Sequence, residues 1–423
     1  MPAKKPPARH RGRRLLWTGA RTLGRSMLRV LPGVSKENQW RKIGEDWFAT
    51  LGELKGAAMK LGQIASQYRD ILPPALAEQL ARLQRQAEPL PFSKMHPLLD
   101  AQWSKAQWQL VEHIEPTALA SASIGQVHRA KLADGRAVVI KIRYPGVAEA
   151  VDADLENLGR LIRMAGKLPV DREGLKALMQ EIRARFVEET DYTNERRNLE
   201  GFLRDPMEGF RFPEPVPELC TDGVLVLTEI QADDAEAARH YPQALRDRIG
   251  NRLTDWVVQQ IFVTGRLHAD PHPGNFGFTP EGEIVVYDFG CVKHLGPETQ
   301  AGLRAVLSAS VAKDWPALHA GLQRLGVVHM PYDSHPVIFG RIYAEHCEAI
   351  LDPVMRRERF DLSDGSLLEN GRIAAQRAIP HWPKFRVAAE LAFVTRTLSG
   401  LYWLQRGLKA RVALREKILA LAG

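Results

Sequence analysis

The sequence predicts an α+β fold with two lobes, in which a small β-rich lobe with a long helix precedes a mostly helical lobe. A helical extension comes before both lobes. Apolar residues recur every three or four positions over residues 38–83, which is helical spacing. The period then shortens to β-favouring runs on either side of Asp134-Gly135, a strong hairpin signal. From Ala244 onward, helical spacing dominates.

The first segment is a basic tail, residues 1–37. The 423-residue chain has a net charge of +8, but residues 1–30 hold nine basic and no acidic residues, so the other 393 carry a net charge of −1. Leu15, Trp17 and Leu28 are interleaved with these arginines. The pattern fits a short amphipathic helix on an anionic membrane, an organellar transit peptide or a solvated, flexible tail. Because the basicity is confined to the tail, we expect no nucleic-acid partner.

Composition limits the class of protein further. Hydrophobic residues make up 45% and charged residues 26%, as expected for a globular chain. The longest charge-free stretches, such as Pro116–His128, are shorter than the roughly 18 residues of a membrane helix, so we predict no transmembrane segment. The three cysteines show no CxxC or zinc-ligand spacing, and an odd number argues against a disulfide framework. We expect a cytoplasmic protein whose membrane contact, if any, is peripheral.

The helical extension covers residues 38–100 and ends in a proline-broken patch at 73–74 and 89–97. The β-rich lobe covers residues 101–230. Its strands are expected within 111–132 and at Ala137–Ile142, helices over 147–168 and 175–203, and further β-like runs at 210–216 and 224–230. The helical lobe covers residues 231–423, with one short β run at Ile284–Tyr287 and a helix start at Gly296-Pro297-Glu298.

Five elements follow one another in the order found in protein-kinase-like phosphoryl transfer. A loop of small residues, 120–127, precedes Lys141, which ends a buried β run. Carboxylates at 188–195 follow on the long helix. Asp270 and Asn275 then stand five residues apart, and Asp288-Phe289-Gly290 comes one short hairpin later. The order predicts a protein-kinase-like two-lobe fold.

The motifs resemble those of the UbiB-type atypical kinases, also called AarF-like, which are associated with coenzyme Q biosynthesis. The resemblance rests on Lys60-Leu61-Gly62-Gln63, the family's K-x-G-Q motif, and on the Ala/Ser-rich loop at 120–127. It is completed by the Glu189–Tyr192 segment with Glu195 behind it, the block His268–Asn275, and Asp288-Phe289-Gly290. Together these motifs span roughly residues 38 to 300.

The resemblance implies ATP or ADP and Mg²⁺ as cofactors, and a role for each matching residue. Lys141 would contact the α and β phosphates and pair with Glu195, and Asp270 would be the catalytic aspartate. Asn275 and Asp288 would bind the metal ion, since hard oxygen ligands suit Mg²⁺. The remaining nucleotide contacts would be Ala120, Ser121, Ala122, Ser123, Ile124, Gly125, Val127, Glu229 and Ile230, and the residues of a regulatory lid over the cleft would be Lys60, Gly62, Gln63, Glu189 and Asp191.

Two departures from ordinary protein kinases bear on the acceptor. Alanines and serines replace the glycines of the nucleotide loop, which makes it stiffer. The chain from Gly290 to the helix start at Pro297 is too short for an activation segment, and Ala269 stands where an arginine would read a phosphorylated one. Both departures favour a small or lipid-like acceptor, or ATP hydrolysis used as a conformational signal.

We therefore expect an atypical kinase or ATPase that supports quinone or isoprenoid lipid biosynthesis, with an adenine nucleotide and a lipid or quinone precursor as ligands. A catalytically weak, ATP-gated scaffold of a lipid-biosynthetic complex is the alternative from another class. A Ser/Thr protein kinase is a third alternative, which the short segment after Gly290 disfavours.

Overall fold

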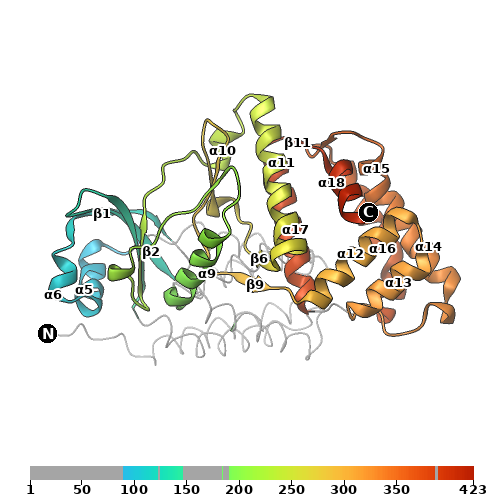
Figure 1. Ribbon diagram of the computed structural model, residues 1–423, viewed down its shortest axis with the longest axis horizontal. Coiled ribbons are helices and arrows are strands. Elements are labelled where there is room, and N and C mark those ends of the chain that lie inside the picture. The colour runs from blue at the N-terminus through green and yellow to red at the C-terminus, as the bar shows by residue number, and fades with distance from the viewer. Residues whose placement is uncertain (1–88, 122–123, 146–182, 184–189, 386–388) are drawn as a thin grey trace, which may run out of the picture. The chain divides into compact units, whose positions relative to one another are not determined.

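The computed structural model describes residues 89–121, 124–145, 183, 190–385 and 389–423 (Figure 1). The described residues form two compact units. The first comprises those up to Arg197 together with Glu214–Glu229, and the second comprises Asn198–Pro213 and Ile230–Gly423. Outside the described residues lie the basic tail, residues 38–88 of the helical extension, and six residues singled out from the sequence: Lys60, Gly62, Gln63, Ala122, Ser123 and Glu189.

A four-stranded antiparallel sheet forms the centre of the first unit. Its order is β1 (Val111–Ser121), β2 (Gly125–Leu132), β3 (Ala137–Arg143) and β5 (Val224–Thr228). The predicted hairpin between β2 and β3 is confirmed, with Lys131 opposite Ala137 and Gly135 at φ +90°. A positive φ is readily adopted only by glycine, which explains why this residue marks the turn.

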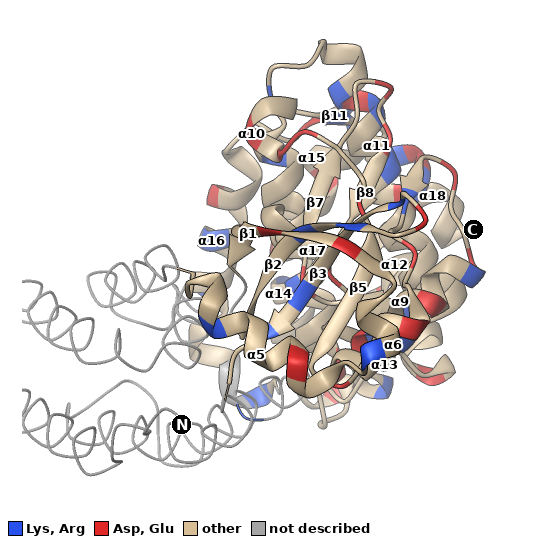
Figure 2. Ribbon diagram, turned by 90° about the vertical axis from the view of Figure 1, so that its left-hand side faces the viewer, with Lys and Arg blue, Asp and Glu red and all other residues tan. Residues whose placement is uncertain are grey.

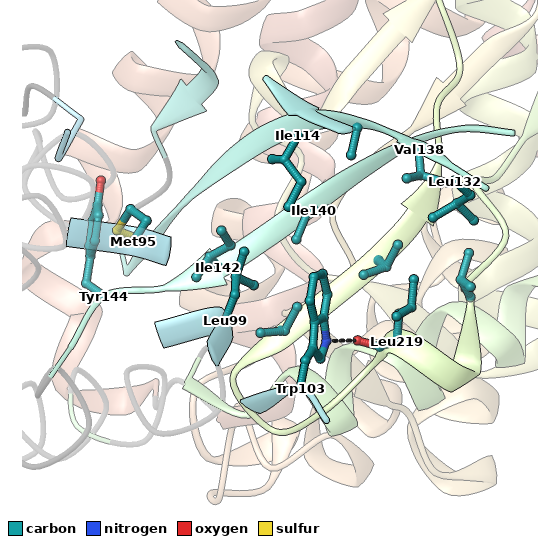
Figure 3. Packing of buried hydrophobic residues seen from close by; sticks show 14 residues of the cluster. Met95, Leu99, Trp103, Ile114, Leu132, Val138, Ile140, Ile142, Tyr144 and Leu219 are labelled. Atoms are coloured by element: carbon teal, nitrogen blue, oxygen red, sulfur yellow. Dashed lines mark hydrogen bonds between the residues drawn. The ribbon is translucent and has the colours of Figure 1, made fainter. Parts of the chain in front are cut away.

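One face of this sheet carries the core of the first unit. Along β3, Val138, Ile140 and Ile142 are fully buried, and the intervening residues, Lys141 among them, lie on the opposite face. Helix α5 (Phe92–Gln102) covers the buried face with Met95 and Leu99 (Figure 3).

Short segments beside α5 close the edge of this core. Helix α6 (Lys105–Trp108) follows α5, and the 3₁₀ turn η2 (Pro217–Leu219) precedes β5. The Trp103 indole N–H donates to the Leu219 carbonyl over 2.9 Å (Figure 3). The sequence predicts that the prolines at 89–97 interrupt helical structure, but α5 begins directly after Pro91 and continues through Pro97. The apolar contacts of this helix with the sheet offset the backbone hydrogen bond that Pro97 cannot make.

Helix α9 (Tyr192–Arg204) covers the C-terminal part of the range 175–203, where the sequence predicts a long helix. Asp191 begins it, because its Oδ1 accepts the backbone N–H groups of Thr193 and Asn194 at 3.0 and 3.2 Å. The residues of α9 up to Arg197 belong to the first unit and the rest to the second.

The second unit opens with helices α10 (Ala235–Ala238) and α11 (Gln243–Gln259), followed by a π-helical turn η3 (Gln260–Thr264). Two small sheets then form. One pairs β6 (Arg266–His268) with β9 (Val292–His294), and the other has the order β4 (Phe210–Arg211), β8 (Ile284–Val286), β7 (Phe276–Phe278). Of these strands, β4 lies in the β-like run predicted at 210–216 and β8 in the run predicted at Ile284–Tyr287, whereas β6, β7 and β9 are not predicted from the sequence. The 3₁₀ turn η4 (Pro273–Asn275) precedes β7.

Helices make up most of the remainder of the second unit (Figure 1). Helix α12 (Pro297–Ala312) begins with Gly296 as its N-cap and Pro297 in its first turn, as predicted. The elements that follow are α13 (Trp315–Arg324), η5 (Tyr332–Ser334), α14 (Pro336–His346), η6 (Cys347–Leu351), α15 (Asp352–Met355), β10 (Phe360–Asp361), α16 (Ser366–Ala378), η7 (Ile379–Lys384), α17 (Ala389–Gly407), β11 (Arg411–Val412) and α18 (Leu414–Ala422).

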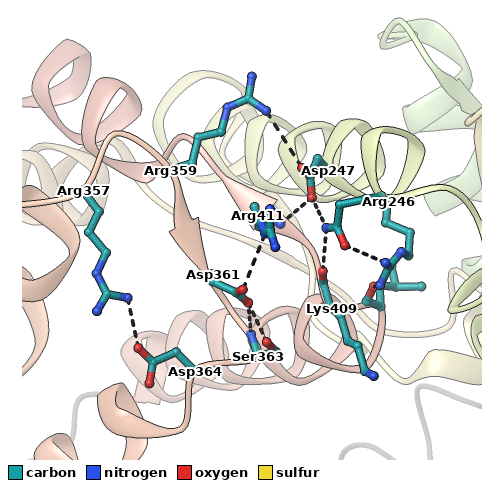
Figure 4. A network of polar contacts seen from close by, with 11 residues as sticks. Arg246, Asp247, Arg357, Arg359, Asp361, Ser363, Asp364, Lys409 and Arg411 are labelled. Carbon is teal, nitrogen blue, oxygen red and sulfur yellow. Dashed lines mark hydrogen bonds and ion pairs between the residues drawn. The ribbon is translucent and has the colours of Figure 1, made fainter.

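A polar network connects α11 with Arg359, Lys409 and Arg411 (Figure 4). Asp247 Oδ1 accepts the Gln243 amide at 2.6 Å and the backbone N–H of Arg411 at 2.8 Å, while its Oδ2 lies 3.9 Å from Arg359. Gly250 lets the two segments approach, because a Cβ atom there would lie 2.6 Å from that of Ala410.

Basic and acidic residues are interspersed over the described helices and strands (Figure 2). This mixture matches the net charge near zero that the sequence has outside the tail. In the part of the chain that the structure describes, none of the helices has the length and apolar character needed to cross a membrane.

Candidate functional site

Lys141 and Glu195 form a buried ion pair in the first unit. Lys141 lies on β3 opposite Leu225 of β5, and its Nζ is 2.9 Å from both carboxylate oxygens of Glu195 on α9. Their side chains are 13% and 3% exposed, so the pair is shielded from water. The Tyr192 ring adds a cation–π contact, with its centroid 5.2 Å from Nζ. The predicted ion pair is present, and its role toward phosphates stays a prediction.

Arg143 holds the start of α9 to this sheet and was missed from the sequence. Its Nη1 donates to the carbonyl oxygens of Thr190 and Asp222, and its Nη2 lies 3.1 Å from the Asp222 carboxylate. Since Arg143 stands two residues after Lys141 on one strand, the two side chains share a face of the sheet. This separation of two residues along a predicted strand is the sequence signal that could have placed Arg143 beside Lys141.

The small-residue loop lies at the β1–β2 turn. Ala120 and Ser121 end β1 opposite Val127 and Gln126, and Ile124 is buried just before β2. Gly125 has a packing reason to lack a side chain, because a Cβ atom would lie 2.3 Å from the Ile142 carbonyl oxygen. The structure therefore explains Gly125 without a ligand, and the nucleotide contacts of the loop stay predictions.

The backbone amide of Glu229 is already used within the first unit. It donates to the Ala137 carbonyl over 3.0 Å, and the Glu229 carboxylate accepts the Arg129 Nε–H over 2.7 Å. An adenine contact at Glu229 would therefore fall to its carbonyl oxygen. Ile230, the nucleotide contact predicted next to Glu229, is the residue at which the chain enters the second unit.

Asp270 lies in the second unit on the loop between β6 and η4, and is 25% exposed. The Asn275 side-chain amide donates to Asp270 twice, over 2.9 Å to its carbonyl and 3.0 Å to Oδ2. Arg396 on α17 donates from Nη2 to Oδ1 over 2.5 Å. The structure thus brings Asp270 and Asn275 together, and it adds Arg396, which carries no motif in the sequence.

The Asp288-Phe289-Gly290 turn is fixed from several sides. Asp288 Oδ1 accepts the Gly290 N–H at 2.9 Å, and Asn198 donates to the Phe289 carbonyl over 2.9 Å. His268 Nε2 lies 2.7 Å from the Asp288 carbonyl, to which only a protonated Nε2 can donate. Burial lowers the pKa of His268, which keeps its ring neutral near pH 7.

The oxygen atoms at this site fit Mg²⁺ as an ion shared with phosphate. Because the Asn275 amide nitrogen is used on Asp270, its Oδ1 is the atom left to act as a ligand. Within the described residues, no group of three or more His, Cys, Asp or Glu residues could hold a metal ion. Asn275 and Asp288 would therefore need phosphate oxygens and water to complete the six ligands of Mg²⁺.

The segment after Gly290 runs straight into β9 and then α12. Ala269 is fully buried, and its N–H donates to the Cys291 carbonyl over 2.9 Å. An arginine would not fit at this position without displacing its neighbours. The structure agrees with the short connection seen in the sequence.

The fold and these residues define an α+β domain of the protein-kinase-like class. The chain belongs to the ABC1 atypical kinase-like family, whose domain matches residues 82–320. The family resemblance seen in the motifs is thereby confirmed.

Several curated relatives carry kinase names, among them the following two. Atypical kinase coq-8, mitochondrial, of Caenorhabditis elegans is 33% identical over 256 residues, which cover 59% of this chain and 34% of that protein. Protein ACTIVITY OF BC1 COMPLEX KINASE 8, chloroplastic, of Arabidopsis thaliana is 27% identical over 410 residues, which cover 89% of this chain and 53% of that protein. The chain therefore spans about a third to a half of the length of these relatives.

One solved structure is similar over most of its length. The complex of Rv3197 with erythromycin from Mycobacterium tuberculosis has a TM-score of 0.59 and 27% identity, covering 90% of this chain and 95% of that one.

Proposed function

We propose that this protein binds ATP or ADP with Mg²⁺ and acts as an ATPase or an unorthodox kinase with a small or lipid-like acceptor. The buried Lys141–Glu195 pair is the observation that carries the proposal. Protein kinases use a strand lysine held by a helix glutamate to bind the α and β phosphates. Membership of an atypical kinase family supports the same interpretation.

The remaining roles follow from the chemistry of the side chains. Lys141 would donate to phosphate oxygens while Glu195 keeps its ammonium group in place. Asn275 Oδ1 and the Asp288 carboxylate would hold Mg²⁺, which neutralises phosphate charge when bound. Asp270 would orient the acceptor hydroxyl or water and accept its proton.

The acceptor class is inferred from the missing protein-docking features. The short connection after Gly290 and the buried Ala269 leave no counterpart of a phosphorylated activation segment in this stretch of described chain. A lipid or quinone precursor in quinone or isoprenoid lipid biosynthesis is the substrate class that the family resemblance favours. The basic tail would bring the protein to the membrane surface that holds such a substrate.

Nucleotide binding tests the proposal first. Isothermal titration with ATP and ADP, with and without Mg²⁺, should show binding that Mg²⁺ tightens. Asp288→Asn should lose most of this Mg²⁺ dependence because it removes a charged ligand. Asp100→Asn, at an exposed pair with His96, is the matched control and should behave as wild type. Equal Mg²⁺ dependence in Asp288→Asn and wild type would reject the metal assignment.

A measurement of ATP turnover then distinguishes an enzyme from the alternative, an ATP-gated scaffold. An assay of phosphate release, with and without anionic vesicles, should show Mg²⁺-dependent hydrolysis that Asp270→Asn abolishes. Tight nucleotide binding with no turnover, and no transfer to extracted lipids, would instead favour the ATP-gated scaffold.

A further inference from the structure

Helix α17 is the support of the loop that carries Asp270. Thr397 donates its hydroxyl to the His268 carbonyl over 3.3 Å. Gly400 lies so close to Pro271 that a Cβ atom would be 2.3 Å from its ring. Arg396, on the same helix, bonds Asp270 itself. Three neighbouring positions of α17 thus contact residues 268–271.

Asn275 and Arg396 both donate to the Asp270 carboxylate. Asn275 occupies Oδ2 and Arg396 Nη2 occupies Oδ1. The guanidinium group is planar and rigid, so a bond from Nη2 also fixes the direction of Nη1. The Arg396 side chain is only 15% exposed, which makes this orientation persistent.

Nη1 of Arg396 has a different environment. It is buried, and it has no hydrogen-bond partner among the residues that the structure describes. A buried donor without an acceptor is destabilising, and such groups in native proteins are rare unless a ligand, an ion or water satisfies them. The acceptor that best suits a guanidinium group is an anionic oxygen, above all one of a phosphate.

We propose that Arg396 binds the terminal phosphoryl group of the nucleotide through Nη1 while Nη2 holds Asp270. This inference rests on the proposed function and names the residue that distinguishes ATP from ADP. Phosphoryl transfer places negative charge on the terminal phosphate oxygens, and an arginine supplied by the same chain stabilises that charge in some nucleotide hydrolases.

Affinity for a non-hydrolysable triphosphate tests the inference without turnover. With Mg²⁺ present, wild type should bind AMP-PNP more tightly than ADP. Arg396→Gln should weaken AMP-PNP binding about tenfold and leave ADP within about twofold, because only the triphosphate reaches Nη1. Arg406→Gln, on the same helix and bonded to Tyr402, is the matched control and should change neither affinity.

A second variant guards against misfolding. If Arg396→Gln loses its cooperative thermal transition, Arg396→Lys takes its place in the binding test. Lysine keeps the positive charge, but its single nitrogen cannot bond Asp270 and a phosphate in the same geometry. Its preference for AMP-PNP over ADP should also fall. An unchanged preference in a folded variant, or equal weakening of both nucleotides, would overturn the inference alone. Failure of wild type to bind either nucleotide would overturn the proposed function and this inference with it.

Discussion

Lys141 and Glu195 stabilise the fold only as a pair, because a single buried charge is unfavourable. Both are buried, and each would be costly to leave in place without the other. A surface pair such as Lys131 with Glu112 has half-exposed side chains that water can solvate when the bond breaks. The difference predicts how each pair responds to substitution.

Glu195→Gln should lower the free energy of unfolding by about 3 kcal/mol, because it removes the carboxylate that stabilises the buried Lys141 ammonium group. Urea denaturation measures this change. The matched variant Glu112→Gln should have little effect. Combining Lys141→Met with Glu195→Gln should recover part of the lost stability, since neither charge of the pair then has to be buried. Equal effects of Glu195→Gln and Glu112→Gln would contradict the buried character of the pair.

His128 gives the first unit a dependence on pH. The side-chain amide of Gln126 donates to the Leu90 carbonyl over 3.0 Å and lies 2.7 Å from His128 Nε2. His128 Nδ1 lies 2.8 Å from the Glu115 carbonyl. A neutral ring protonated on Nδ1 satisfies both contacts. Burial lowers the pKa of His128 below its ordinary value of 6.5, against a smaller opposite effect of the Glu115 carbonyl.

The sign of the effect follows from this direction. Above pH 6.5 both folded and unfolded chains carry neutral His128, so its contribution to stability is complete. As the pH falls below 6.5, the unfolded chain binds the proton first, and stability is lost until the pH passes the lowered folded pKa.

We expect the free energy of unfolding to fall less steeply between pH 7.5 and about 5.5 in His128→Asn than in wild type. His113→Asn, at an exposed position on β1, should keep the wild-type slope. Identical slopes for His128→Asn and wild type would show that His128 does not carry the effect.

At the scale of elements, the strands around Lys141 depend on one glycine. Gly125 pairs with Arg143 at the start of β2, and a Cβ atom there would meet the backbone of Ile142. Backbone atoms, unlike the end of a flexible side chain, cannot move aside without disturbing the strand pairing.

Gly125→Ala should therefore destabilise the protein by about 1–3 kcal/mol in urea denaturation. Gly407→Ala, which would meet no atom within 4 Å, should leave stability near that of wild type. If the two alanine variants unfold at the same urea concentration, the close approach of β2 and β3 does not require a glycine at position 125.

Elements with a strong local signal could be predicted from the sequence. The β2–β3 hairpin follows from Asp134-Gly135, and the start of α12 follows from Gly296-Pro297. Strands β6, β7 and β9 have three residues each, which is too short for a period to show. Strand β8 is equally short, but its three residues are all β-branched, and that run is its signal in the sequence. The helix through Pro97 forms because tertiary packing outweighs a local breaker.

At the scale of the whole molecule, contacts between distant segments escape a sequence pattern. Residues 198–213 belong to the second unit because Phe202 and Phe210 pack on Trp256. No local pattern in the sequence predicts this packing. Lys141, Asp270, Asn275 and Asp288 could be named from motif order alone. Arg396 could not, since it meets Asp270 across 126 residues of chain.

The tail provides a prediction for the whole chain. Residues 1–30 carry nine basic residues and no acidic ones. Each basic residue contributes at most about 1 kcal/mol of binding free energy at an anionic membrane surface. Deleting them should reduce co-sedimentation with anionic vesicles and leave Mg²⁺-dependent nucleotide binding intact. Salt should weaken the binding of the full chain by screening these charges. Equal sedimentation of both forms would mean that the tail has another role.

The long reach from Arg396 to Asp270 has a consequence for synthesis. A ribosome makes the chain from its N-terminus, so Asp270 and Asn275 emerge long before α17 exists. Arg411 and Lys409, which bond α11 across more than 160 residues, arrive later still. A nascent or prematurely terminated chain therefore presents the aspartate without its arginine. The contact between Asp270 and Arg396 can form only after the ribosome has made α17.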